Sequence, residues 1–432
     1  MVVIRRSPES RARGHRRAVS PGRALLSLLT GLALAAVATA CQPRLQDREG
    51  GTLHVLIATP SGEALTAESV ETDLGEFKTL IEGFRALHPR VTLAFAVFQE
   101  SRLMEELRRR NAAGLAPDLV LMSASRAVQL ERHQLIKPVT IPADELSQLE
   151  MEGLTRVDLG NNHFAGVPVL QEPQLACFNR NRMPNPPATV DDLIQMAQKG
   201  FAFGLSVEPS QVYWSTGSLG ATPSVLAALE NQPLSAGEKS QITAWLGWLQ
   251  NLNRNQEVSF LPDKDHLVNQ LARKELDWIP CRCGNIALLK RYLGDGLGVA
   301  PLPSGPGGPP SPITRQLVWG FGLNSSPNQQ RLAEQLVRFS INPLSQRTLT
   351  LSTLEVLPAN RLALPAVGTS PIIDAMLQSQ KHGRYGHVFG RLVTEDGDRI
   401  TKVRELLVAV IFGELTPEQA TDRLIRIEKE GR

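Results

Sequence analysis

Along the first third of the chain, apolar residues follow two alternating spacings. Short apolar runs at residues 53–58 and 119–122, and an alternating run at 91–98, predict three β-strands. Between these strands, the apolar side chains of residues 77–87 and 103–110 recur every three or four positions, which predicts two amphipathic helices. Strands and helices alternating in this order predict a parallel α/β sheet with right-handed crossovers.

A proline-rich stretch, residues 166–192, interrupts this alternation. Residues 167–170 suit a half-buried strand, which the neighbouring prolines keep extended. Three prolines within 184–187 then exclude both a helix and an interior strand. Thr189 predicts the N-cap of the next helix, because two aspartates follow in the first turn, where the helix dipole favours them.

Helical spacing returns in the later part of the chain. Residues 237–252, 267–272 and 328–342 predict helices, and a further helix is expected to begin at Gln346. The first of these places Trp245 on its apolar face, so we expect that ring to pack in a core.

The chain is too long for one hydrophobic core, since it has 432 residues, and we expect two or three domains. Its 42% hydrophobic and 21% charged residues are typical of a soluble globular protein. The formal net charge of +3 is misleading, because residues 1–40 contain seven arginines and one glutamate, which leaves the rest near −3. Basic character thus belongs to the leader, and nothing indicates nucleic-acid binding.

The leader predicts export. An arginine-rich beginning precedes an uncharged apolar run, residues 24–40, which ends in small residues as a secretory signal does. Cys41 follows and resembles the cysteine of the bacterial lipobox, which receives lipid and becomes the new N-terminus, although Ala38 stands where the lipobox prefers Leu. A soluble exported protein cleaved near Ala40 is the alternative. The arginine pairs of the leader lack the flanking residues of a twin-arginine signal.

Three cysteines remain for the exported part, Cys177, Cys281 and Cys283. Export permits disulfides. A bridge from Cys177 to one of the other two is geometrically more plausible than a bridge between cysteines separated by one residue. A Cys-x-Cys metal site needs two further ligands, so small buried side chains are the preferred interpretation.

The segment Phe178-Asn179-Arg180-Asn181, followed by Pro184-Asn185-Pro186-Pro187-Ala188-Thr189, resembles the first crossover of the extracellular solute-binding proteins that supply ABC importers. Within that family it is most similar to the maltose and maltodextrin-binding group. Phe178 stands for the family's usual Tyr, and Val190 for its usual Trp. Further similar segments lie at residues 130–139, 204–220, 277–285, 297–303, 318–323, 353–359 and 412–420.

The resemblance implies an α/β fold of the periplasmic-binding-protein type II class, with two discontinuous α/β lobes joined by three crossovers around a ligand cleft. The implied domains are a signal peptide (1–40), a lipid anchor and tether (41–52), a first lobe (53–166 and 320–358) and a second lobe (167–319 and 359–432). A ligand that bridges both lobes would stabilise a closed form, so the resemblance implies a hinge-bending clamp.

Hydroxyl and carboxyl side chains follow two of the predicted parallel strands. Ligands bind beyond the carboxyl ends of strands in such sheets. Ser61 and Glu63 after the first strand, and Ser123 and Ser125 after the third, are therefore candidate ligand contacts. Ordinary strand-to-helix loops are the alternative interpretation of these positions.

Aromatic residues are candidates because a ring can cover the apolar face of a sugar. Tyr213 and Trp214 lie in the segment that resembles the family's aromatic sugar platform, although Ser210 replaces the aromatic residue after Glu-Pro. Core packing is the alternative for both rings, since Trp is usually buried.

Three further candidates come from the family likeness. Arg282 stands where the family has an aromatic that stacks on sugar, which indicates a charged or hydrogen-bond-rich ligand, with an ordinary surface side chain as the alternative. Trp319 lies in the segment that resembles the second crossover, which would put it at the floor of the cleft. Tyr385 lies where a further aromatic often enters the site.

The resulting hypothesis is a monomeric lipoprotein on the periplasmic, extracytoplasmic face of a bacterial membrane. It would capture a sugar or similar polyol and deliver it to the membrane subunits of an ABC importer. No cofactor, metal or enzymatic activity is expected, because the motifs of nucleophilic, phosphate-binding and zinc-dependent enzymes are missing from the sequence. The alternatives are a non-transporting sensor or scaffold lipoprotein with the same fold, or a binding protein for a non-sugar solute.

Overall fold

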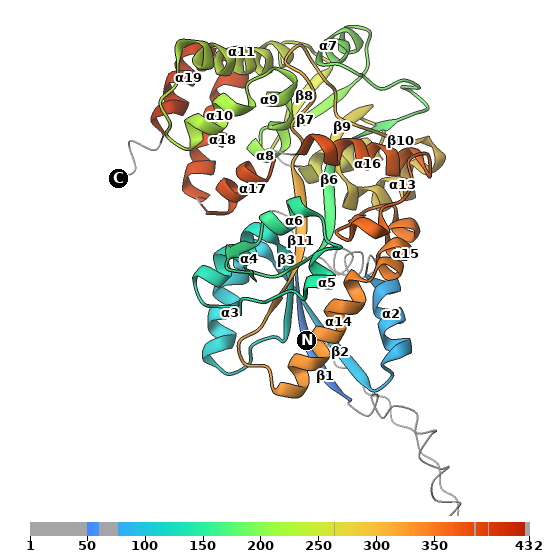
Figure 1. Cartoon of the computed structure of the whole chain (residues 1–432). Coiled ribbons are helices and arrows are strands. Elements are labelled where there is room, and N and C mark those ends of the chain that lie inside the picture. Colours follow the sequence, from blue (N-terminus) through green and yellow to red (C-terminus); the bar gives the residue numbers. More distant parts are fainter. Residues whose placement is uncertain (1–49, 60–76, 263, 384–385, 396, 428–432) are drawn as a thin grey trace, which may run out of the picture. The chain divides into compact units, whose positions relative to one another are not determined.

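The computed structural model describes residues 50–59, 77–262, 264–383, 386–395 and 397–427, all within one compact unit, Glu49–Arg432 (Figure 1). The predicted signal peptide, the lipidation candidate Cys41 and most of the tether lie outside the described residues. The same is true of the candidate contacts Ser61, Glu63 and Tyr385.

One mixed sheet organises the described chain, with strands in the order β2-β1-β3-β11-β6-β9-β7-β8 and with β10 and β12 paired to β6. Its strands are β1 (Gly51–Thr59), β2 (Val91–Gln99), β3 (Leu119–Ser123), β6 (Val167–Asn179), β7 (Phe203–Ser206), β8 (Val258–Leu261), β9 (Trp278–Arg282), β10 (Leu297–Ala300), β11 (Thr314–Phe321) and β12 (Leu357–Pro358). A separate hairpin joins β4 (Asp158–Gly160) to β5 (His163–Phe164).

The helices fall into two groups according to the core that they cover. The first group is α2 (Lys78–Leu87), α3 (Leu103–Ala112), α4 (Ala124–Arg132), α5 (Ala143–Leu146), α6 (Met151–Thr155), α14 (Pro327–Ile341) and α15 (Pro343–Thr353). The second is α7 (Val190–Gln198), α8 (Pro209–Val212), α9 (Trp214–Ser218), α10 (Thr222–Leu229), α11 (Ala236–Leu252), α12 (Lys264–Ala272), α13 (Ile286–Leu293), α16 (Pro371–His382), α17 (Gly386–Glu395), α18 (Gly397–Ile411) and α19 (Pro417–Arg426).

The predicted alternation at the start of the chain is confirmed. β1 pairs in parallel with both β2 and β3, and α2 and α3 connect the strands. Apolar side chains from these helices, such as Leu80 and Leu107, are buried against the sheet. The two spacings of apolar residues therefore separated strands from helices correctly, because each element buries one face on the same core.

Strand β6 connects the two parts of the sheet. Its first half pairs with β11 and its second half with β9 and β10. All of its residues are buried, whereas the sequence predicted a half-buried strand. The difference arises because partners lie on both edges and helices on both faces, which a single strand sequence does not show. Figure 1 shows β6 and β11 running together from one group of helices to the other.

An irregularity in β6 explains how prolines fit into a central strand. The register to β11 shifts between Leu317 and Val318, so that Val169 of β6 has no direct partner on that strand. The Val169 carbonyl instead accepts hydrogen bonds from the side-chain amide of Gln346 at 2.6 Å and from the backbone of Ala359 at 3.1 Å. A bulge next to Pro168 lets the strand tolerate a residue without an N–H donor.

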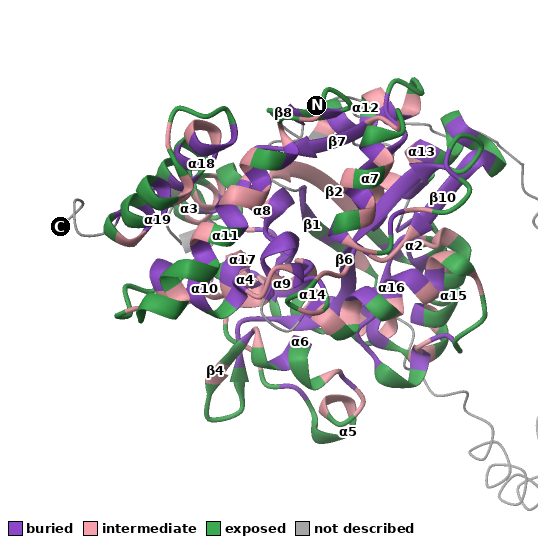
Figure 2. Cartoon of the chain, turned by 90° about the horizontal axis from the view of Figure 1, so that it is seen from above, coloured by how far each residue is buried: buried purple, intermediate pink, exposed green. Residues whose placement is uncertain are grey.

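The second half of the sheet buries both faces. Along β6, Ala176 and Phe178 belong to one core, while Leu175 and Cys177 belong to another on the opposite face. This follows from the two-residue period of a strand. Figure 2 shows β6 and β7 buried, whereas the outward face of α19 is exposed.

Helix starts follow local capping chemistry. The predicted N-cap at Thr189 is confirmed, because its hydroxyl accepts from the Asp192 amide and the Asp192 carboxylate accepts from the Thr189 amide. The helix expected from Gln346 instead begins at Pro343, three residues earlier. Asn342 caps it through its side chain, and proline is favourable in a first helical turn, where the missing N–H is not needed.

The pairing judged more plausible from the sequence, from Cys177 to one of the other two cysteines, is confirmed, whereas the preferred interpretation as small buried side chains is wrong for that pair. Cys177 of β6 and Cys281 of β9 form a disulfide, with Cα atoms 5.7 Å apart. They can do so because the two antiparallel strands point both side chains into the same core. Cys283 is a buried thiol outside the disulfide, and it donates to the Pro173 carbonyl at 3.0 Å.

Candidate functional site

A cavity of about 460 Å³ lies between elements that pack on different hydrophobic cores. One wall comes from α4 and residues 155–158, the other from α8, α17 and the end of β9, and β11 contributes from between them. Figure 1 shows α4 and α6 on one side and α8 and α17 on the other. The polar lining residues are Glu100, Ser123, Ser125, Arg126, Arg132, Thr155, Arg156, Asp158, Ser210, Arg282, Thr314, Arg315, Gln316, His387 and Arg391.

The carboxyl end of β3 supplies the first wall through the start of α4. The Ser123 hydroxyl caps this helix by accepting from the Arg126 amide at 3.3 Å. It also lies 3.3 Å from the Ser125 hydroxyl. The Ser123 amide donates to the buried Glu100 carboxylate at 2.8 Å. This network holds two hydroxyls and a carboxylate at the cavity edge, where they can accept from a polar solute or donate to it.

Arg126 occupies the first turn of α4, one residue beyond Ser125. Its guanidinium bonds to Gln129, and its Nε is buried without a hydrogen-bond partner in the described chain. Burial lowers the pKa of the Arg126 guanidinium, and the Glu100 charge partly opposes that shift. Arginine nevertheless stays protonated at neutral pH, so the wall carries a partly desolvated positive charge.

Arg315 lies on β11 at the boundary between the cores. Its guanidinium is 3.6 Å from the Glu100 carboxylate and 3.4 Å from that of Glu172, and it donates to the Ala58 carbonyl at 2.9 Å. Glu172 is its register partner on β6. Arg315 therefore links the carboxyl ends of β1 and β2 to the middle of β6.

Arg156 is more deeply buried, with 8% of its side chain exposed. It donates to the Thr314 carbonyl at 2.7 Å and pairs with the Glu152 carboxylate at 2.5 Å. Burial lowers the pKa of Arg156, while Glu152 opposes that shift. This side chain thus joins the hairpin region to the start of β11.

The opposite wall also offers cations and hydroxyls. Arg282 ends β9, and its amide is held by the Asn285 side chain at 3.0 Å. Ser210 lies in α8, and His387 and Arg391 lie in α17. Arg391 is 3.6 Å from the Glu230 carboxylate. A polar solute in the cavity could therefore reach side chains from both groups of helices.

Of the candidates from the sequence, the structure brings together Ser123, Ser125 and Arg282 on this cavity. Ser210, singled out for replacing a family aromatic, lines it as well. Ligand contact stays a prediction for these residues.

The aromatic candidates lie in the cores. Tyr213 is 1% exposed and stacks on Phe389 at 4.1 Å, and Trp214 is fully buried. Trp319 is 3% exposed and donates through Nε1 to the Ser340 hydroxyl at 3.0 Å. Rings buried this deeply offer no surface to a solute, so their ligand role stays a prediction, and the cavity is lined by other residues.

Sequence reasoning missed most of the charged lining, chiefly Arg126, Arg156 and Arg315. For Arg126 a signal existed, since it follows Ser125 directly at the carboxyl end of a predicted strand. For Arg315 the signal was an arginine before the apolar run of a crossover strand, where burial requires a partner. For Arg156 the local signal was its spacing of four residues from Glu152, with which it pairs across one turn at the end of α6.

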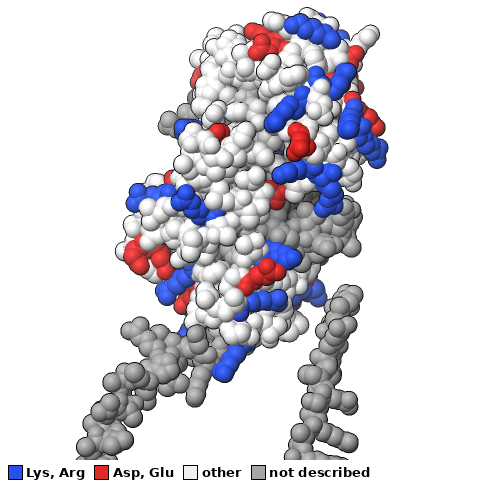
Figure 3. All heavy atoms as spheres, turned by 90° about the vertical axis from the view of Figure 1, so that its right-hand side faces the viewer, with Lys and Arg blue, Asp and Glu red and all other residues white. Residues whose placement is uncertain are grey.

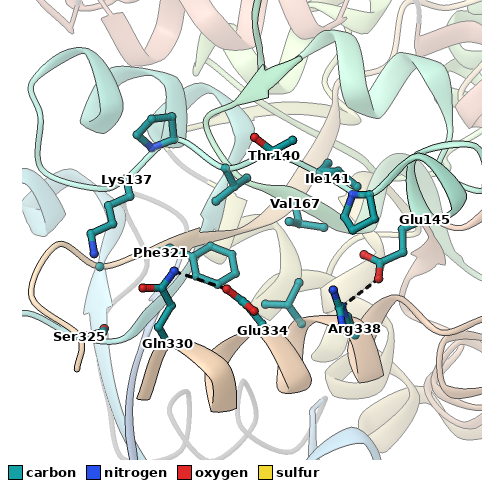
Figure 4. A pocket seen from close by; sticks show the side chains of 15 residues that line it. Lys137, Thr140, Ile141, Glu145, Val167, Phe321, Ser325, Gln330, Glu334 and Arg338 are labelled. Carbon is teal, nitrogen blue, oxygen red and sulfur yellow. Dashed lines mark hydrogen bonds and ion pairs between the residues drawn. The ribbon is translucent and has the colours of Figure 1, made fainter. Parts of the chain in front are cut away.

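A second hollow, the α14 groove, lies within the first group of helices and has a volume of about 290 Å³. Figure 4 shows residues 137–142 and Glu145 facing α14 across it. Arg338 pairs with Glu145 at 3.0 Å across it, and Glu334 accepts from the Gln330 side chain at 3.4 Å. Because its lining comes from one group of helices, the groove lacks the two-sided construction of the larger cavity.

The described part of the chain offers neither a metal-binding cluster nor a membrane-spanning helix. Among those residues, no group of three or more His, Cys, Asp or Glu side chains could hold a metal ion. No helix of the described ranges is long and apolar enough to cross a membrane.

Comparison with known proteins supports the fold and the family that the sequence predicted. No curated protein matches the chain. A solved structure of the GacH receptor of Streptomyces glaucescens GLA.O, studied unliganded and with acarbose and an acarbose homolog, is similar with a TM-score of 0.70 and 14% sequence identity. The likeness covers 88% of this chain and 98% of that one, and it confirms the predicted periplasmic-binding-protein fold. The family model for bacterial extracellular solute-binding proteins matches residues 79–372, more than half of the chain. The chain therefore belongs to the bacterial extracellular solute-binding protein family, as its sequence predicted.

Proposed function

We propose that this protein captures a sugar or similar polyol in the cavity between α4 and α17 and delivers it to an ABC importer. The observation that carries the proposal is the two-sided lining of the cavity, with hydrogen-bonding side chains from both groups of helices. Family membership and the acarbose complex of the similar GacH receptor support a saccharide. Hydroxyl-rich solutes need many donors and acceptors, which serines, threonines and arginines supply.

The proposed mechanism is closure of two lobes on the solute. The lobes are residues 53–166 with 320–358, and residues 167–319 with 359–432. β6, β11 and the segment that enters β12 pass between them and would act as the hinge. A solute that contacts Ser123 and Arg282 together stabilises the closed form by the contacts it makes only there. The importer's membrane subunits would recognise that form.

The proposed location is the extracytoplasmic face of a bacterial membrane. Membership of an extracellular family supports export. The apolar leader and Cys41 support cleavage and lipid attachment, with residues 42–52 as a tether to a monomeric binding unit. A soluble exported form cleaved near Ala40 remains the alternative.

We propose binding without catalysis. The lining includes two carboxylates, Glu100 and Asp158, as a glycosidase would require. Both are engaged structurally, since Glu100 holds the Ser123 amide and Asp158 accepts from the Gly160 amide at 2.9 Å. Tight binding of an unchanged saccharide supports this proposal, whereas turnover would overturn it.

Thermal shift and calorimetric titration of residues 42–432, which contain the whole compact unit, test the proposal. The probes are neutral and acidic saccharides, polyols, amino acids and polyamines. A saccharide that raises the melting temperature and binds with one-to-one stoichiometry is the expected result. A response only to amino acids or polyamines would favour the alternative of a non-sugar solute. A saccharide that binds while a strain lacking the protein still imports it would favour the sensor or scaffold.

A further inference from the structure

The lining of the cavity is strongly cationic. Among its described residues are six arginines, at positions 126, 132, 156, 282, 315 and 391, against two carboxylates, Glu100 and Asp158. They come from α4, the α6–β4 turn, the end of β9, β11 and α17, which are far apart in the sequence. A low-dielectric cavity lined by one sign of charge concentrates its field on whatever enters.

This charge is not a property of the whole protein. After the leader the chain has a net charge near −3, because the +6 of residues 1–40 is removed from a total of +3. Figure 3 shows acidic and basic side chains interspersed on one outer face, with much of that face uncharged. Arginine side chains are therefore concentrated at the cavity, whereas the chain after the leader has a slightly negative net charge.

Carboxylates hold some of these arginines in place. Arg156 pairs with Glu152, Arg315 with Glu100 and Glu172, and Arg391 with Glu230. These pairs orient three guanidinium groups at the cavity.

Arg126 is the most informative of the six. Among the described residues no carboxylate forms an ion pair with it, and its Nε is buried without a hydrogen-bond partner. Partial burial of a guanidinium without an ion-pair partner is unfavourable even with the Glu100 charge nearby, so this side chain is suited to receive an anion. The start of α4, with its backbone amides and the Ser125 hydroxyl beside Arg126, adds further donors for an anion.

The described lining contains no Phe, Tyr or Trp. Neutral sugars usually gain affinity from an aromatic ring against their apolar face. The cavity instead offers guanidinium forks, which match the geometry of carboxylate, phosphate and sulfate groups.

We propose that the solute is an anionic saccharide, a sugar or polyol carrying a carboxylate, phosphate or sulfate group, whose charged group lies against Arg126 and Arg282. This inference rests on the proposed function, because it names the class of solute that the same cavity takes. The hydroxyls of the sugar would bond to Ser123, Ser125 and the polar side chains of β11.

Calorimetric titration of residues 42–432 tests the inference with matched probes at millimolar concentration. These are neutral maltotriose, oligogalacturonate as a carboxylate, glucose 6-phosphate as a phosphate, and free sulfate and citrate as anions without a sugar. We expect an acidic saccharide to bind more tightly than maltotriose, with an affinity that falls as sodium chloride is raised. Comparing the affinities of oligogalacturonate and glucose 6-phosphate shows whether the cavity prefers a carboxylate or a phosphate.

Substitutions locate the binding site. Arg126→Gln and Arg282→Gln should each lower the affinity for the acidic saccharide about 10-fold to 100-fold, which is the effect of losing one charged hydrogen bond. Arg423→Gln on exposed α19 and Arg338→Gln in the α14 groove lose the same charge outside the cavity and should leave the affinity unchanged. Equal thermal unfolding of all four variants shows that they are folded.

The outcomes separate this inference from the proposed function. Neutral maltotriose binding as tightly as the acidic sugars, and unaffected by Arg126→Gln, overturns the anionic inference and leaves the saccharide function standing. Binding of citrate or sulfate without any saccharide supports the anion preference and overturns the saccharide function. No response to any probe overturns both.

Discussion

Replacing Glu355 with glutamine should change how the stability of the protein depends on pH. Glu355 lies between α15 and β12, is 3% exposed, and accepts a hydrogen bond from the Ala287 amide in the first turn of α13 at 2.7 Å. Burial raises the pKa of Glu355 to about 7, the Ala287 hydrogen bond opposes the shift, and the nearby Glu172 carboxylate adds to it. The side chain therefore holds a proton in the folded protein at a pH where an unfolded chain has lost it.

The magnitude follows from the size of the pKa shift. A change from 4.5 to about 7 corresponds to about 3 kcal/mol. Because the folded state binds the proton more tightly, this contribution to the free energy of unfolding is fully present below about pH 4.5 and is lost as the pH rises through about 7. Glutamine keeps an acceptor for Ala287 and carries no charge. The stability of Glu355→Gln relative to the wild type should thus rise by up to about 3 kcal/mol across this window.

Urea unfolding at a series of pH values from about pH 4 to about pH 8 measures the effect. Exposed Glu414→Gln loses the same charge at the surface and serves as the control, for which we expect a difference from the wild type of less than about 0.5 kcal/mol throughout. If the stabilities of Glu355→Gln and the wild type run parallel across the whole range, the reasoning about a buried carboxyl group at this position is refuted.

Three further substitutions test the disulfide, the packing of Trp319 and a close backbone approach at Gly307. Replacing both Cys177 and Cys281 by serine should lower the free energy of unfolding by about 2–5 kcal/mol, since their disulfide closes a loop with a sequence separation of 104; an unchanged melting temperature would contradict this. Trp319→Ala should lower the free energy of unfolding by about 3–5 kcal/mol, because the ring is buried in the core that the first group of helices covers. The folded fraction should keep its affinity for the solute. Lost affinity at unchanged stability would instead show that Trp319 contacts the solute. Gly307→Ala should destabilise by about 1–3 kcal/mol, since a Cβ there would lie 1.9 Å from a backbone nitrogen, whereas Gly237→Ala on α11 meets no neighbour and should not; equal melting temperatures for the two variants would argue against this close approach.

The fold could largely be predicted from the sequence because each element buries its apolar side chains at its own spacing. Residues 53–58 form the middle of β1, and the N-cap at Thr189 follows from side-chain chemistry that acts within one turn. The full burial of β6 could not be predicted, since it depends on which distant strands pair with its two edges. The disulfide depends on the same long-range register.

The candidate site was less predictable, because its residues come from elements far apart in the chain. Ser123 and Ser125 could be found from the rule that ligands bind at strand ends. An aromatic residue in a strand, such as Trp319, carries no local sign of which face is turned inward. Arg282 could be found from the family likeness, but only the folded chain shows that the six arginines face a common cavity.

The position of a bound solute tests the central claim most directly. A crystal structure of residues 42–432 with the saccharide that most raises the melting temperature measures it. Our account predicts the solute in the cavity, in contact with α4 on one side and with α17 or Arg282 on the other. A solute bound in the α14 groove, or held by only one group of helices, would contradict it.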